Sequence, residues 1–126
     1  MSMRTPLSRT RGLGSAKEGA DHFWWQRVTA VANLFLSIFI VAIIVRLIGA
    51  DYATTKATLA SPIVAVPMLL FVLSASYHMK LGMQTILEDY VQSEGRKTLF
   101  IILNIFYSAF VGLTCVFAIL KLSFGA

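Results

Sequence analysis

One stretch of the sequence, from position 78 to position 90, carries the side chains best suited to chemistry. His78 lies near the end of a long apolar run, Gly82 follows four positions later, and Asp89 and Tyr90 follow at eleven and twelve. Because a helix turns by about 100° per residue, His78 and Asp89 share one helix face, roughly 16 Å apart along the axis. Gly82 removes a side chain from nearly the same face, so a flat ligand could approach the backbone there. That face therefore combines an imidazole, a gap and an acid–phenol pair.

The position of His78 within a membrane-length apolar run indicates a functional site, because an ionisable group in a bilayer is costly unless something binds it. Neutral imidazole is the usual protein ligand of haem iron, and Ser74 or a backbone group could orient its second nitrogen. Zinc is disfavoured because no cysteine or histidine cluster lies nearby. The alternative is a histidine that hydrogen-bonds to a neighbouring helix. A haem with two histidine ligands would need a second subunit.

The other candidate site residues lie near the ends of apolar runs. The Tyr90 phenol could donate to a quinone carbonyl, and Asp89 could tune that phenol or relay the protons that quinone reduction requires. The alternatives are an interfacial aromatic anchor and a solvated carboxylate. Arg27 could pair with a haem propionate, or it could be a positive charge at a helix end. Lys80 could extend toward the interface or also meet a propionate.

The elements that must position these residues are apolar runs of about the 20 residues needed to cross a membrane. There are three: Val28–Val45, Ile63–Met79 and Leu99–Leu120. Hydrophobic residues make up 57% of the 126 residues and charged residues only 13%, against roughly 25% charge in a soluble domain. The sequence therefore predicts an all-α integral membrane protein without a soluble catalytic domain. Its expected organisation is an N-terminal arm and interfacial segment over 1–26 and a three-helix domain over 27–126, with helices at about 27–48, 62–90 and 97–121.

Shorter signals refine this layout. Residues 1–20 are polar and basic and predict an irregular or extended arm, after which Asp21 could cap a short interfacial helix. A partial helical turn is expected at residues 54–59 in the first loop. Ser61 and Pro62 predict the start of the second spanning helix, as its N-cap and first helical residue.

The net charge of +5 does not indicate a nucleic-acid partner, because the basic residues flank the apolar runs. Seven lie in the two segments that must share one side of the membrane, and three lie on the other. The first group is Arg4, Arg9, Arg11, Lys17, Arg27, Arg96 and Lys97, and the second is Arg46, Lys56 and Lys121. The positive-inside rule then predicts a cytoplasmic N-terminus and an outside C-terminus.

At these residues the sequence resembles the small membrane-anchor subunit of succinate dehydrogenase, the D-type cytochrome b556 anchor of respiratory complex II. The family pattern is a histidine, a glycine four residues on, and Asp-Tyr at +11 and +12, which here are His78, Gly82, Asp89 and Tyr90. A second match is a His/Asp pair followed by Arg-x-Thr-Ala, here Asp21-His22 and Arg27-Val28-Thr29-Ala30. The three-helix layout and the cytoplasmic N-terminus also agree with this family.

The resemblance implies an anchor in a bacterial inner (cytoplasmic) membrane that forms half of a heterodimeric helix bundle. His78 would be one axial ligand of haem b, and a C-type cytochrome b556 anchor subunit would supply the other. Tyr90 would hydrogen-bond ubiquinone with Asp89 behind it, and Arg27 would contact the haem propionates or the quinone pocket. The two anchors would dock an iron–sulfur subunit, with a flavoprotein subunit beyond it. Electrons would pass from succinate to quinone in the tricarboxylic acid cycle and respiratory chain, an activity that no single subunit completes.

Two other functions remain open. A quinol:fumarate reductase anchor would use the same parts in the reverse direction. A small transporter or channel subunit would be expected to hold an acid or base deep in the membrane, often within repeats. The acids Glu88 and Asp89 are instead expected at the interface, and the sequence has no internal repeat, which disfavours that class.

Overall fold

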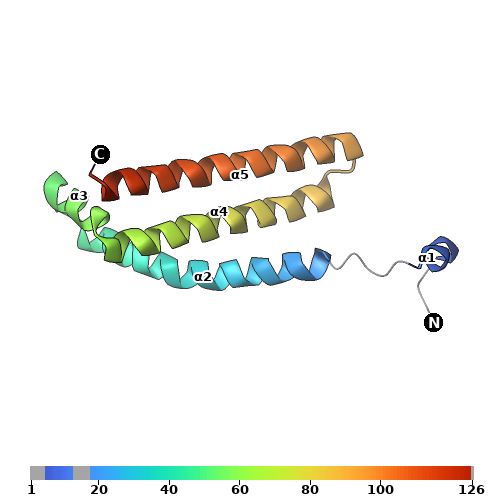
Figure 1. The fold of residues 1–126 in the computed structure, drawn as a ribbon, viewed down its shortest axis with the longest axis horizontal. Helices are drawn as coiled ribbons and strands as arrows, with labels where there is room; N and C mark the ends of the chain where they lie inside the picture. Colours follow the sequence, from blue (N-terminus) through green and yellow to red (C-terminus); the bar gives the residue numbers. More distant parts are fainter. Residues whose placement is uncertain (1–4, 13–17, 126) are drawn as a thin grey trace.

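The computed structural model describes residues 5–12 and 18–125, and over these ranges the regular secondary structure is helical, without strands. The helices are α1 (Pro6–Arg11), α2 (Glu18–Arg46), α3 (Tyr52–Ala60), α4 (Pro62–Tyr90) and α5 (Glu94–Ser123). Figure 1 shows the three long helices α2, α4 and α5 running alongside one another, with α3 across one end. The predicted all-α fold is confirmed.

The three long helices are long and apolar enough to cross a membrane. They contain 29, 29 and 30 residues, so at 1.5 Å per residue each is about 43–45 Å long. A bilayer core is only about 30 Å thick. Each helix can therefore span the hydrocarbon region and continue into the headgroup region, and the prediction of three spans is confirmed.

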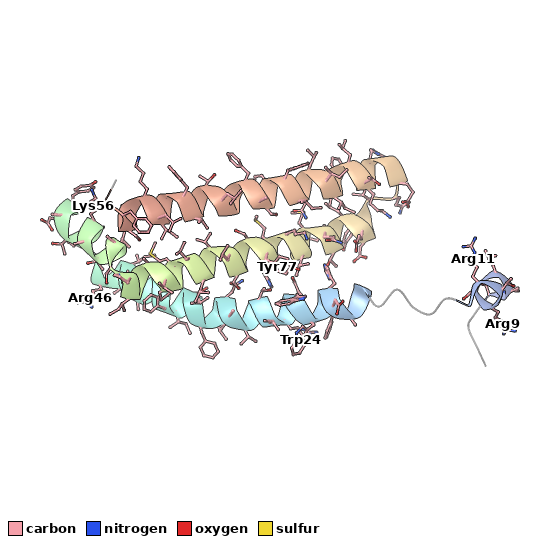
Figure 2. All side chains as sticks on the ribbon, viewed as in Figure 1. Arg9, Arg11, Trp24, Arg46, Lys56 and Tyr77 are labelled. Carbon is pink, nitrogen blue, oxygen red and sulfur yellow. The ribbon has the colours of Figure 1, made fainter. Side chains whose placement is uncertain are left out.

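The long helices form a layer rather than a closed bundle. Helix α4 packs against α2 on one side and α5 on the other, whereas α2 and α5 do not touch within the described ranges. The buried apolar residues of the described chain are correspondingly few: Val64, Ala65, Leu81 and Ile119. Figure 2 shows side chains projecting away from the helices along their whole length. Most of the apolar surface therefore faces lipid or other protein chains.

Close packing of α4 on α5 depends on small and polar residues. A Cβ added to Gly112 would lie 3.1 Å from Ser76 Oγ and 3.3 Å from Ser76 Cβ, so the two helices touch at this point. About two helix turns from Gly112 along α5, buried Asn104 donates from Nδ2 to the Lys80 carbonyl at 2.9 Å. Small residues and interhelical hydrogen bonds are the usual contacts between helices in a membrane, where neighbouring apolar surfaces gain little from leaving lipid.

Helix α3 and helix α4 share Ser61 as a boundary. The Ser61 N–H donates to the Thr58 carbonyl at the end of α3, and the Ser61 carbonyl accepts from Ala65 N–H at 2.7 Å. Helix α4 begins at Pro62, as predicted, but the Ser61 side chain makes no capping hydrogen bond. The partial turn expected at residues 54–59 is a complete helix over Tyr52–Ala60.

Asp51 caps the start of α3. Its carboxylate accepts the Thr54 N–H at 3.0 Å. Hydrogen bonds to the ionised carboxylate lower the pKa of Asp51 below its ordinary value. The largest effect comes from the Thr54 side chain and the next from the Thr54 backbone N–H. The ionised form of Asp51 is therefore the one that supports α3.

Other boundaries differ from those predicted. Residues 6–11 form α1, with Thr5 accepting the Ser8 N–H at 3.2 Å, so the prediction of an irregular arm is wrong there. Residues 1–4 and 13–17 of that arm lie outside the described residues. Helix α2 starts at Glu18 rather than near 27, so Asp21 lies within the helix and does not cap it. An apolar run marks membrane depth and not the ends of a helix, so a helix can begin before the run and include polar residues such as Asp21 and His22.

Candidate cofactor site between α2 and α4

The contact between α2 and α4 is lined by polar residues in the half that contains His78. On α2, four polar residues recur at intervals of four, three and four positions, which places them on one helix face: His22, Gln26, Thr29 and Asn33. From α4, Ser74, His78 and Gly82 meet this face. This row of side chains is called the polar seam below.

Thr29 is the direct partner of His78. Its Oγ1 lies 3.0 Å from His78 Nδ1, although the two residues are 49 positions apart. The same oxygen lies 2.7 Å from the Trp25 carbonyl and 3.2 Å from the Gln26 carbonyl. Thr29 is 6% exposed and His78 is half-buried. The imidazole is thus oriented by a buried hydroxyl group that is itself attached to the backbone of α2.

Ser74 does not contact His78 in the way that the sequence suggested. Its hydroxyl donates to the Thr29 carbonyl at 3.3 Å and so ties α4 to α2 one turn from the imidazole. Thr29 was missed as a site residue because its partner lies on another helix. The available signals were its place in the Arg-x-Thr-Ala match, where it was given no role, and its position on the same face of α2 as His22 and Gln26.

The second ring nitrogen of His78, Nε2, has no hydrogen-bond partner among residues 5–12 and 18–125, and it is not an enclosed atom. The other histidine of the chain, His22, precedes Thr29 by seven positions, or about 10 Å along α2. Its Nε2 is buried in the described structure and so is not open to a ligand. No cluster of three metal-binding side chains occurs in the described part of the chain. Within the described residues, His78 Nε2 is thus the imidazole nitrogen that is both unpartnered and accessible to a ligand.

The space beside Gly82 is occupied by Gln26. A Cβ added to Gly82 would lie 3.4 Å from Gln26 Nε2. An amide of the same chain therefore borders the gap expected for a flat ligand. Gln26 Oε1, His22 Nε2 and Asn33 Oδ1 are buried atoms without a hydrogen-bond partner in the described structure, so the polar seam retains unused hydrogen-bonding capacity.

Arg27 lies off the polar seam on α2. Its guanidinium stacks on the Phe23 ring, 3.9 Å from the ring centroid. Arg27 is exposed and has no acidic partner in the described residues. The stacking restrains the side chain while leaving its five N–H donors available to an anion.

Asp89 and Tyr90 lie at the C-terminal end of α4, and both are exposed. Tyr90 is 81% exposed and borders a hollow of about 390 Å³ with Arg96 and Phe100. His78 and Tyr90 are 12 positions apart, or about 18 Å along the helix. The structure therefore separates the imidazole from the acid–phenol pair and does not form one combined site.

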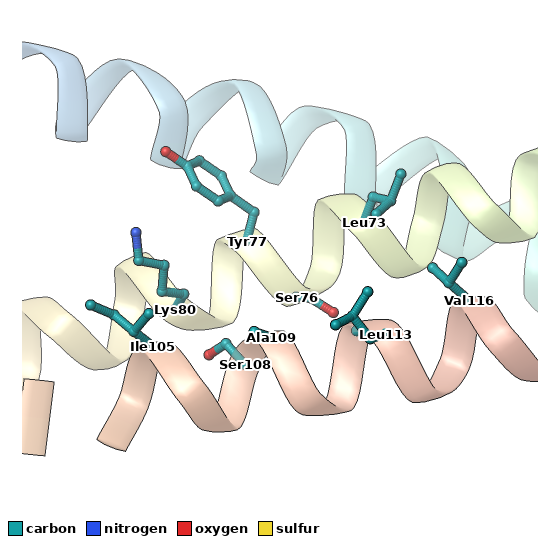
Figure 3. A pocket seen from close by; sticks show the side chains of 10 residues that line it. Leu73, Ser76, Tyr77, Lys80, Ile105, Ser108, Ala109, Leu113 and Val116 are labelled. Atoms are coloured by element: carbon teal, nitrogen blue, oxygen red, sulfur yellow. The ribbon is translucent and has the colours of Figure 1, made fainter. Parts of the chain in front are cut away.

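A groove of about 430 Å³ lies between α4 and α5, lined by Leu73, Tyr77, Lys80, Ile105 and Ala109 among others. Figure 3 shows Tyr77 and Lys80 on one side of α4 at this groove. Lys80 Nζ lies 5.4 Å from the Tyr77 ring centroid, and that ring meets Trp25 edge-on at 6.1 Å. None of His78, Arg27, Asp89 and Tyr90 lines this groove.

The chain is similar to known membrane-anchor proteins over nearly its whole length. The Paracoccus denitrificans protein named succinate dehydrogenase hydrophobic membrane anchor subunit is 33% identical over 122 residues, covering 97% of this chain and 94% of that protein. A protein of the same name from Rickettsia bellii (strain RML369-C) is 32% identical over 104 residues, covering 82% and 83%. Residues 1–113 match the family described as succinate dehydrogenase/fumarate reductase transmembrane subunit. The chain therefore belongs to this family of membrane-anchor subunits.

Proposed function

We propose that this chain anchors succinate:ubiquinone oxidoreductase in the bacterial inner membrane and shares haem b and the quinone site with a C-type anchor. The observation that carries this proposal is His78, whose imidazole is held at Nδ1 and has no partner at Nε2 among the described residues. His78 lies in a helix long and apolar enough to span a membrane, in a chain that matches the succinate dehydrogenase/fumarate reductase transmembrane subunit family. The relatives quoted above are named as succinate dehydrogenase anchors, which favours this direction over fumarate reduction.

The residues present fit one side of a haem b. His78 would bind the iron through Nε2, while its Nδ1 contact with Thr29 holds the ring in place. Arg27, stacked on Phe23 and otherwise unpaired in the described chain, would offer its guanidinium to a propionate. The haem supplies one-electron storage when bound. The second axial ligand would come from another subunit, because the other histidine of the sequence, His22, has its Nε2 buried in the described structure.

The open layer of helices supports a heterodimeric bundle. Helices α2 and α5 do not touch, and the large apolar side chains of α2 are mostly exposed. Covering one face of α2 and α4 with the helices of a C-type anchor would enclose His78 and exclude lipid from the haem. Membrane lipid would cover the remaining apolar surface. The iron–sulfur subunit, with the flavoprotein subunit beyond it, would dock at the cytoplasmic end.

The exposed end of α4 would contribute to the quinone site. Tyr90 is the last residue of α4 and is exposed, and its phenol would donate to a carbonyl of ubiquinone. Asp89 would tune this donor and pass protons from the cytoplasm to the reduced quinone. With the N-terminus cytoplasmic, this end of α4 also faces the side on which the iron–sulfur subunit docks.

The shared haem can be tested by comparing the chain produced alone with the chain produced together with its partner subunits. The purified four-subunit complex should hold one haem b per chain and reduce quinone with succinate. The chain alone should retain little haem, because it supplies one axial ligand and cannot shield the haem edge. A stoichiometric, six-coordinate haem in the isolated chain would contradict the proposal, as would a haem-free complex.

A further inference from the structure

We infer that Thr29 is a positioning residue that fixes the tautomer of His78, by donating its hydroxyl proton to the Trp25 carbonyl and accepting the His78 Nδ1–H. This inference rests on the proposed haem ligation by His78 and adds to it the residue that prepares the ligand. Its starting point is one buried oxygen, Thr29 Oγ1, that lies within hydrogen-bond distance of three polar atoms.

The direction of these hydrogen bonds follows from the number of protons available. A hydroxyl group has one proton, and carbonyl oxygens can only accept. Thr29 Oγ1 lies 2.7 Å from the Trp25 carbonyl oxygen, the usual separation for an O–H···O hydrogen bond. If the proton pointed at His78 instead, two oxygen atoms would face each other at that distance with no proton between them. The proton therefore belongs to the Trp25 carbonyl.

Other helical threonines of the chain follow the same pattern. Four of them donate to the carbonyl four positions earlier at 2.7–3.1 Å: Thr10, Thr58, Thr85 and Thr114. This contact is a common one for threonine within a helix. Thr29 differs in that its lone pairs then meet an imidazole nitrogen at 3.0 Å. Because those lone pairs can only accept, His78 Nδ1 has to carry the ring proton.

The consequence for ligand binding concerns the opposite nitrogen. A neutral imidazole with its proton on Nδ1 has its free lone pair on Nε2, the atom that lacks a partner in the described chain. Thr29 is 6% exposed, so water competes little for this contact. The Ser74 hydroxyl holds the Thr29 carbonyl at 3.3 Å and keeps α2 and α4 in register. The chain thereby prepares an imidazole whose lone pair is directed to an iron ligand position.

The test compares Thr29 variants in the purified four-subunit complex, with haem content and haem midpoint potential as the readouts. Thr29→Val keeps the shape of the side chain and removes the hydroxyl. Loss of a group that orients a metal-binding histidine costs about 10- to 100-fold in affinity, so haem retention should fall during dilution. The remaining haem should have a more positive potential, because an imidazole without an Nδ1–H partner is less basic and stabilises ferric iron less.

Two controls separate this role from general packing. Thr29→Ser restores the hydroxyl and should return the potential to that of the unmodified complex. Thr114→Val removes an equivalent threonine-to-carbonyl bond on exposed α5 and should leave haem content and potential unchanged. If the Thr29→Val complex does not assemble, Thr29→Cys replaces it. Its thiol is a weak donor and acceptor, so a smaller shift in the same direction is expected.

The outcomes distinguish this inference from the proposed function. If His78→Ala loses the low-spin haem but neither Thr29→Val nor Thr29→Cys changes retention or potential, Thr29 does not position the ligand, while the haem assignment stands. If His78→Ala keeps the haem spectrum unchanged, both the ligand assignment and the role of Thr29 are overturned. A shift in Thr29→Ser as large as that in Thr29→Val would show that packing rather than the hydroxyl is responsible.

Discussion

Replacing helical glycines by alanine should give a graded effect on stability that depends on what each new Cβ would meet. Gly95 lies in open space, a Cβ at Gly82 would lie 3.4 Å from Gln26 Nε2, and a Cβ at Gly112 would lie 3.1 Å from Ser76 Oγ. Alanine is favoured over glycine within a helix by about 1 kcal/mol. Gly95→Ala should therefore be neutral or stabilising, and Gly82→Ala should be similar because its new contact is of ordinary length.

Gly112→Ala is expected to behave differently. The neighbouring Ser76 Cβ, 3.3 Å from the added carbon, is fixed to the backbone of α4 and cannot rotate away. Inserting a methyl group into such a contact costs about 1–3 kcal/mol, against the gain of about 1 kcal/mol in helix propensity. The net result should be a destabilisation of up to about 2 kcal/mol, with separation of α5 from α4 as its structural cause.

The assay is reversible unfolding of the chain in mixed micelles with increasing denaturing detergent, followed by circular dichroism. Gly112→Ala should unfold before the other two variants. Ser76→Gly removes both close atoms but places a glycine in α4, so the Gly112→Ala change is also made in the Ser76→Gly background, where it should no longer destabilise. Equal midpoints for Gly95→Ala and Gly112→Ala, or an equal loss from Gly112→Ala in both backgrounds, would refute the assigned contact between α4 and α5.

Three further predictions concern the quinone, the loop helix and the topology. Tyr90→Phe keeps the ring but removes the hydrogen-bond donor. An unmade hydrogen bond worth about 1–3 kcal/mol corresponds to a loss of roughly 5- to 150-fold in quinone reductase activity. Succinate oxidation with a soluble dye that takes electrons upstream of the quinone should survive, and equal loss of both activities would assign Tyr90 to docking. The capping contribution of Asp51 to the stability of α3 should be complete above the ordinary aspartate pKa of about 3.9. It should be lost as the pH falls through the lowered pKa of Asp51 in the folded state. Hydrogen exchange of the Thr54 amide measures this loss, and protection that does not fall on acidification would exclude the cap. A reporter fused after Ala126 should be active only outside the cytoplasm, and cytoplasmic activity would mean that the orientation is reversed.

Much of the fold follows from local sequence. The bounds of α4, Pro62–Tyr90, agree with the prediction because a serine–proline pair marks its start and its polar last turns continue the helix. The early start of α2 and the presence of α1 were missed because hydropathy reports membrane depth rather than helix ends. Thr5 and Pro6 were the available signal for α1, a capping threonine followed by proline at the first turn.

The site was predicted less completely than the fold, because its geometry depends on contacts between helices. The periodicity of α4 placed His78, Gly82 and Asp89 on one face, but it could not show that the Gln26 amide lies beside Gly82. It also could not show that Thr29, 49 positions away, is the partner of His78. Both contacts depend on how α2 and α4 are aligned along the membrane normal, which is fixed by tertiary packing.

Ligation of haem b by His78 is tested most simply by the reduced-minus-oxidised optical spectrum of the purified four-subunit complex that carries His78→Ala. Ser76→Ala is the matched control, since Ser76 lies on the same helix but faces Gly112 of α5. We expect Ser76→Ala to keep the sharp α band of a six-coordinate haem b, whereas His78→Ala should lose the haem or convert it to a high-spin form. A low-spin spectrum of full intensity in the His78→Ala complex would contradict the assignment of His78 as the ligand.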